Sequence, residues 1–185
     1  LESCGRHCAP RYHFQMELFS ACLAALNEPE PAKKCVLAEA LYQAWLAGGV
    51  GMDEGVPVAA IAEPGRPAKP ILVPPLDVPR RKITSAIGRA ALLHAISHIE
   101  FNAINLALDA AYRFRGMPRE FYGDWRKVAA EEALHFSLVR GHLQSLGYDY
   151  GDFAAHNGLW EMAVKTAHDP LVRMALVPRV LEARG

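Results

Sequence analysis

The chain has 185 residues, of which 51% are hydrophobic, so it is long enough to form one domain with a sizeable core. Twenty basic and twenty acidic residues give a formal net charge of zero, which offers no global support for binding nucleic acid or an anionic membrane. Charged residues or histidine interrupt each apolar run before it reaches the roughly 20 residues that span a bilayer. We therefore expect neither a membrane partner nor a nucleic-acid partner.

Residues 1–15 are expected to be an N-terminal arm or an upstream remnant, because they contain no hydrophobic centre of a signal peptide. The four cysteines, Cys4, Cys8, Cys22 and Cys35, form no C-x-x-C pair. Reduced thiols fit a mostly helical chain of this size better than a disulfide framework does. The sequence therefore favours a cytoplasmic location.

Residues 16–50 are expected to form a helical hairpin. Apolar side chains recur at helical spacing over residues 14–26, and prolines end that pattern. A second helical pattern covers about residues 31–47 and stops at a Gly-Gly pair.

Residues 51–83 are expected to form an extended, Pro-rich strap. Seven prolines between Pro57 and Pro79 are spaced too closely for a helix or a central strand. Apolar side chains such as Ile61 and Leu72 remain, so we expect the strap to lie over the domain instead of acting as a free linker.

Residues 84–185 are expected to form the main helical bundle of an all-α fold. A long helix over residues 84–114 is surrounded almost completely by its own apolar side chains, so it should be central. A second long helix covers about residues 118–147, and two shorter helices follow. Pro178 should kink or break the last of them.

Glu132 and His135 stand three residues apart in the second long helix, so they project from one face. Apolar residues at helical spacing place them in an apolar stripe, where a carboxylate loses hydration worth roughly several kcal/mol. A metal ion would satisfy both groups. Alternatively, Glu132 pairs with an arginine and His135 is a hydrogen-bonded core histidine.

Two further acids extend this pattern. Glu100 lies on an apolar face of the first long helix, and Glu182 lies in the last helix. Carboxylate-bridged metal sites in helix bundles take one Glu from each of two helices and an E-x-x-H pair from each of the others. The chain supplies Glu100, then Glu132 with His135, then Glu182. Arg179, one turn from Glu182, could instead neutralise that acid without metal.

His94 and His98 are four residues apart, a spacing that can bind a metal. They point away from the face of Glu100 on the same helix, so a structural role or the support of a metal ligand fits them better. Glu131 and Asp109 are candidate partners for the second ring nitrogen of a histidine ligand.

Three stretches carry a family resemblance: LLHAISHIEFNA at residues 92–103, AAEEALHF at residues 129–136, and GLWEM at residues 158–162 with ALVPRVLEARG at residues 175–185. From about Met16 onward the chain resembles a family of largely uncharacterised ferritin-like proteins, domain-of-unknown-function family 455. The resemblance implies a ferritin-like bundle, related to di-iron carboxylate proteins that include tRNA-modifying hydroxylases. It also implies metal-ligand roles for Glu100, Glu132, His135 and Glu182.

Members of that family continue beyond the position of Gly185 into a further helix with a second acid and histidine pair. We therefore expect a bundle that lacks its last helix and holds about half to two-thirds of a two-metal ligand set. Either the chain is truncated or another chain completes the bundle, so a homo-oligomer is among the expected states.

The preferred function is that of a ferritin-like di-metal oxidoreductase. Two iron ions, or manganese, would activate dioxygen for hydroxylation or a related oxidation of a small-molecule or unknown substrate. The alternative is a metal-free helical interaction or structural protein, in which the buried acids pair with Arg179 and other bases. Bound iron or manganese separates these two functions.

Overall fold

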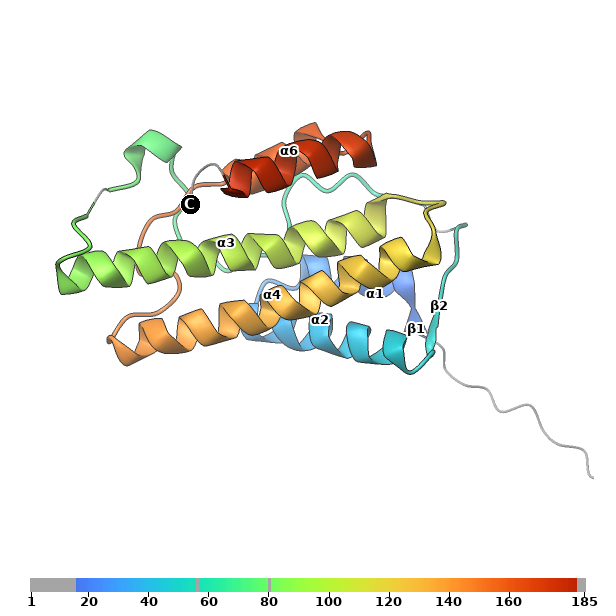
Figure 1. Ribbon diagram of the computed structural model, residues 1–185, viewed down its shortest axis with the longest axis horizontal. Coiled ribbons are helices and arrows are strands. Elements are labelled where there is room, and N and C mark those ends of the chain that lie inside the picture. Colours follow the sequence, from blue (N-terminus) through green and yellow to red (C-terminus); the bar gives the residue numbers. More distant parts are fainter. Residues whose placement is uncertain (1–15, 56, 80, 183–185) are drawn as a thin grey trace, which may run out of the picture.

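The computed structural model describes residues 16–55, 57–79 and 81–182, without the side chains of residues 178–182. Helices dominate this part of the chain and pack side by side (Figure 1), which confirms the expected all-α helical bundle. The helices are α1 (Leu18–Asn27), α2 (Pro31–Leu46), α3 (Ala86–Arg113), α4 (Arg119–Ser145), α5 (Gly158–Lys165) and α6 (Pro170–Glu182). None of the helices in these ranges is long and apolar enough to cross a membrane. The expected arm over residues 1–15 lies outside the described residues.

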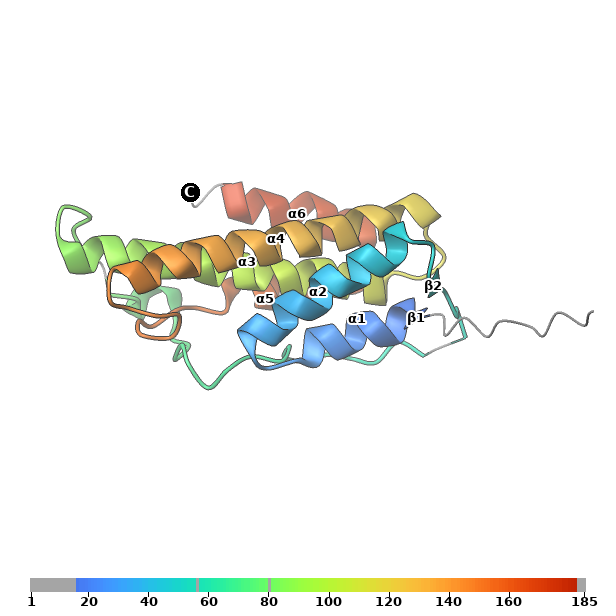
Figure 2. The same cartoon turned by 90° about the horizontal axis from the view of Figure 1, so that it is seen from below.

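α1 and α2 form the expected hairpin on one side of the bundle (Figure 2). Each helix begins after a glutamate whose side chain accepts hydrogen bonds from the free N–H groups of the first turn, Glu17 for α1 and Glu30 for α2. The short strand β1 (Met16–Glu17) pairs in parallel with β2 (Val50–Gly51). This pairing ties the start of α1 to the end of α2.

The described part of residues 51–83 follows an extended course, as its proline spacing predicts. Its regular structure is limited to the end of β2, the 3-10 turn η1 (Pro75–Asp77) and an isolated parallel bridge between Leu72 and Ala155. Tyr112 Oη accepts a hydrogen bond from the backbone N–H of Ala59 at 2.8 Å, and Trp160 Nε1 donates to the carbonyl of Ala62 at 2.8 Å. The bundle therefore holds the strap in place.

α3 and α4 are the two long helices and lie side by side in opposite directions (Figures 1 and 2). The second half of α3 is buried, including Phe101 and Ile104. In its first half, Leu92 is 48% exposed and Ile99 is 42% exposed. The expectation of a central helix is therefore wrong for this half, because these apolar side chains lie on a face of α3 that is open to solvent.

α6 runs back along α3 in the opposite direction (Figure 1). The side chain of Asp169 caps its first turn. Arg173 and Asp109 join α6 to α3 through an ion pair of 2.9 Å, and both side chains are almost fully buried. The helix continues through Pro178, so it does not break there, and a kink at that residue stays a prediction.

Candidate metal centre

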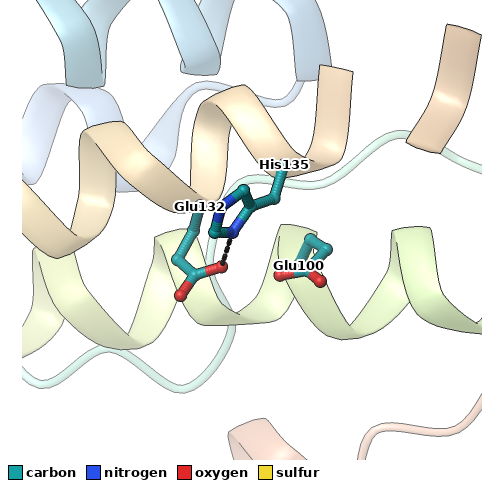
Figure 3. Close-up of side chains that lie close together, drawn as sticks. All are labelled: Glu100, Glu132 and His135. Carbon is teal, nitrogen blue, oxygen red and sulfur yellow. Dashed lines mark hydrogen bonds and ion pairs between the residues drawn. The ribbon is translucent and has the colours of Figure 1, made fainter. Parts of the chain in front are cut away.

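α3 and α4 bring Glu100, Glu132 and His135 together between them (Figure 3). One ligand atom from each residue can be chosen so that all three atoms lie within 4.8 Å of one another. Glu132 and His135 meet because they are one turn apart on α4, and Glu100 approaches them from the facing helix. Three of the four residues predicted as metal ligands thus lie at one place.

His135 Nδ1 lies 3.1 Å from Glu132 Oε2, at the edge of the bundle. The side chain of His135 is 53% exposed, whereas that of Glu132 is 23% exposed. The buried residues of α4 near the pair are Ala129, Ala133 and Phe136. Glu132 directly precedes Ala133 in the sequence, so it lies at the border of the buried face of the helix. The prediction that the pair lies in the middle of the apolar stripe is therefore wrong for His135.

The pKa of Glu100 is raised to about 7, first by its partial burial and then by the hydrogen bonding and charge of Glu132. His135 acts in the opposite direction, because its positive form would stabilise the carboxylate. Near neutral pH the two glutamates therefore do not both ionise readily unless a cation lies beside them.

No lysine or arginine in the described part of the chain forms an ion pair with Glu100 or Glu132. The adjacent residue Glu131 does have such a partner, Lys127, at 3.7 Å. The alternative in which an arginine neutralises Glu132 therefore finds no support among these side chains.

The donor set fits a divalent metal ion. Two carboxylates and one imidazole nitrogen are ligands that iron and manganese accept, and three protein ligands leave coordination positions open for water or a reactant. The half-exposed His135 would leave one side of such an ion accessible. These three residues suffice for one ion, whereas a two-ion centre needs further ligands.

Glu182, the fourth predicted ligand, is the last described residue of α6. Its side chain and that of Arg179 lie outside the described side chains. The ligand role of Glu182, and its neutralisation by Arg179, remain predictions.

His94 and His98 have the structural role that their orientation predicts. His94 Nε2 accepts a hydrogen bond from the backbone N–H of Gly151 at 2.9 Å. His98 Nδ1 lies 2.9 Å from Tyr150 Oη, and its Nε2 lies 3.0 Å from the carbonyl oxygen of His156. Burial lowers the pKa of each histidine to about 4, so both are neutral near pH 7. The hydrogen bonds of His94 and His98 hold residues 147–157 against α3.

The prediction that Glu131 or Asp109 is the carboxylate partner of a histidine ligand is wrong. Asp109 accepts hydrogen bonds from Arg113 and Arg173. Glu131 is exposed and forms its ion pair with Lys127. Both acids therefore form ion pairs with basic side chains, which are stronger partners for a carboxylate than a neutral imidazole is.

Arg173 was not identified from the sequence. It lies with Glu132 on the wall of a cavity between α3, α4 and α6. Its partner Asp109 is 64 positions away, so no local spacing connects them. Ala103 and Ala110, two turns apart on α3, line the same cavity.

Comparison with known proteins identifies a family without an assigned activity. Residues 27–185 match the family described as "Protein of unknown function (DUF455)". A protein of Haemophilus influenzae described as uncharacterized is 54% identical over 173 residues. That similarity covers 87% of this chain, which spans only 59% of the length of the relative. No solved structure matches the chain. The extent of these two matches shows that the chain belongs to the DUF455 family.

Proposed function

We propose that Glu100, Glu132 and His135 bind a metal ion and that the protein is a ferritin-like di-metal oxidoreductase. Iron is the preferred metal and manganese is the alternative, since both accept carboxylate and imidazole ligands. The observation that carries the proposal is the approach of three potential ligand atoms, from two helices, to within 4.8 Å. A bound cation would let both carboxylates ionise despite the raised pKa of Glu100.

Glu182 is proposed as a further ligand, because the course of α6 carries its backbone toward Glu100. α6 is antiparallel to α3, and the ion pair between Arg173 and Asp109 relates the two helices. The same number of residues separates Asp109 from Glu100 and Arg173 from Glu182, about 13.5 Å along each helix axis. This register supports a position for Glu182 level with Glu100.

A bound iron centre would supply dioxygen activation, which suits hydroxylation or a related oxidation of a small organic molecule. The residues of this chain would bind and orient the metal, with the exposed side of His135 leaving access for reactants. In the metal-free protein Glu100 can hold a proton near neutral pH, and metal binding would displace it.

A metal-free interaction protein is the second candidate, favoured by exposed apolar side chains. A groove of about 470 Å³ between α2 and α4 includes Val36, Ala40 and Leu134 in its lining. Val36 is 67% exposed and Leu134 is 57% exposed. Surfaces of this kind bind partner proteins or a second copy of the chain, so a homo-oligomer remains a proposal.

Dioxygen uptake tests the proposed function. Ferrous iron is added to the metal-free protein without oxygen, and air is then admitted. The wild-type chain should consume dioxygen faster than the same iron in buffer, and Glu132→Gln should not. Glu131→Gln is the matched control, because this neighbouring acid pairs with Lys127 outside the site. Equal uptake by wild type and Glu132→Gln would contradict the proposed centre.

A further inference from the structure

A cavity of about 100 Å³ lies between α3, α4 and α6, directly beside the candidate metal centre. Ala103 follows Glu100 by one turn on α3, and Val128 precedes Glu132 by one turn on α4. Both line the cavity, and Glu132 itself forms part of its wall. A molecule in the cavity would therefore contact a carboxylate of the proposed metal site.

The cavity wall is mainly apolar. All three helices contribute apolar side chains to it, among them Ala110, Trp125 and Val177. Among the side chains that the structure describes, Glu132 and Arg173 are the charged residues of the lining. The small side chains of Ala103 and Ala110 leave space that larger residues would fill.

Arg173 does not make this cavity an anion site, because its guanidinium is already engaged. Nη1 donates to Asp109 at 2.9 Å, Nε donates to Thr166 Oγ1 at 2.7 Å, and Nη2 donates to the carbonyl of Ala163. Asp109 also neutralises its charge. Of the described charged groups in the lining, Glu132 is the one that remains available, and a carboxylate repels anions.

We propose that this cavity binds a small, uncharged, apolar molecule and holds it against Glu132. Its role as the substrate of an oxidation rests on the proposed function. An apolar cavity of about 150 Å³ holds benzene, so one of about 100 Å³ suits a chain of about four carbon atoms. An anion of that size would lose hydration without gaining a cationic partner among the described side chains of the lining.

Methyl-resolved NMR of the metal-free protein, with 1-butanol and butanoate as probes, tests the proposal. 1-Butanol should shift the methyl resonances of Ala103, Val128 and Val177 in a saturable way. Butanoate, a chain of the same length with a charged end, should bind at least about tenfold more weakly. Equal binding of butanoate would overturn the preference for an uncharged ligand, and the absence of saturable shifts with 1-butanol would overturn the ligand site.

Two substitutions that fill the cavity test whether 1-butanol binds there or on another apolar surface. Ala110→Leu should abolish the shifts caused by 1-butanol, whereas Ala95→Leu, at an exposed position of the same helix, should leave them unchanged. Ala103→Leu is the second filling variant if circular dichroism shows that the first is unfolded. Undiminished binding of 1-butanol in a folded filling variant would overturn the assignment.

Addition of Mn²⁺ tests the proposed ligand cavity and the proposed metal centre separately. In the wild-type chain, Mn²⁺ should broaden the signals of bound 1-butanol and of the Ala103 and Val128 methyl groups, and in Glu132→Gln it should not. Binding of 1-butanol without this broadening would support the cavity and overturn the proposed metal centre. Broadening of the methyl signals without saturable binding of 1-butanol would overturn the cavity alone.

Discussion

Glu100 on α3 and Glu132 on α4 present carboxylate oxygens within 4.8 Å of each other, across the interface between the two longest described helices. Neither acid forms an ion pair with a lysine or arginine among the side chains that the structure describes. Two ionised carboxylates at this separation repel, so the metal-free protein favours a proton on one of them. Metal binding and proton release should therefore be linked at this site.

The contribution of Glu100 to the free energy of unfolding should fall as the pH rises. The pKa of this carboxyl is about 7 in the folded protein, against an ordinary value of 4.5. Between these values the folded chain keeps a proton that the unfolded chain releases, so rising pH favours unfolding. Urea denaturation of metal-free wild type and Glu100→Gln at a series of pH values measures the difference. Identical pH dependence in the two proteins would contradict the raised pKa.

His94 and His98 should contribute in the opposite direction. Burial lowers the pKa of each from 6.5 to about 4, so the unfolded chain takes up protons at a higher pH than the folded chain. The free energy of unfolding should decrease as the pH falls from 6.5 to about 4, and residues 147–157 should be released from α3. The amide protection factor of Gly151 reports this release, because its N–H donates to His94. A protection factor of Gly151 that stays constant over this pH range would rule out the release of residues 147–157.

Arg126 is buried, and its Cζ lies 3.4 Å from the ring centroid of Trp45. Its guanidinium nitrogens have no hydrogen-bond partner in the part of the chain that is described. Burial of this charge costs several kcal/mol, more than the roughly 0.5–2 kcal/mol gained from the aromatic contact. Arg126→Met should therefore raise the free energy of unfolding by about 1 kcal/mol in chemical denaturation.

Arg119→Met is the control for this substitution, because Arg119 contacts the same ring from an exposed position, with its Cζ at 3.9 Å. It should change the free energy of unfolding by less than about 0.5 kcal/mol. A loss of stability in Arg126→Met, with Arg119→Met unchanged, would contradict the net cost assigned to this buried charge.

Two ion pairs that differ in burial should differ in their effect on stability. Arg173 and Asp109 are 2% and 1% exposed, whereas Arg140 and Asp149 are 26% and 42% exposed. Arg173→Met should lower the free energy of unfolding by about 3 kcal/mol, because Asp109 stays buried with Arg113 as its one remaining ion-pair partner among the described residues. Arg140→Met should cost about 0–1 kcal/mol, since solvent screens that pair. Similar losses in the two variants would contradict this comparison.

The helices were predictable because their signals are local. Helical spacing and the following Gly-Gly pair placed the second helix at residues 31–47, and α2 covers Pro31–Leu46. The approach of Glu132 to His135 follows equally from their spacing on one helix. The meeting of these residues with Glu100 was predicted from the ligand pattern of helix bundles, which relates residues on different helices.

The exposure of His135 could not be read from the sequence, because it depends on which helices cover that face of α4. The ion pair between Arg173 and Asp109 joins residues far apart in the chain, and each residue alone resembles an ordinary surface charge. The cavity beside Glu132 depends on how α6 is seated against α3 and α4. These features arise from tertiary packing, about which helical periodicity carries no information.

Calorimetric titration of Mn²⁺ into the metal-free protein is the decisive measurement, made on wild type, Glu132→Gln and Glu131→Gln. Wild type and Glu131→Gln should bind at most one ion per chain with the same affinity, because Glu131 pairs with Lys127 outside the site. Glu132→Gln should bind at least about tenfold more weakly, and wild type should release a proton near neutral pH when the metal binds. Equal affinity in all three proteins, or no binding by wild type, would contradict a metal centre at Glu100, Glu132 and His135.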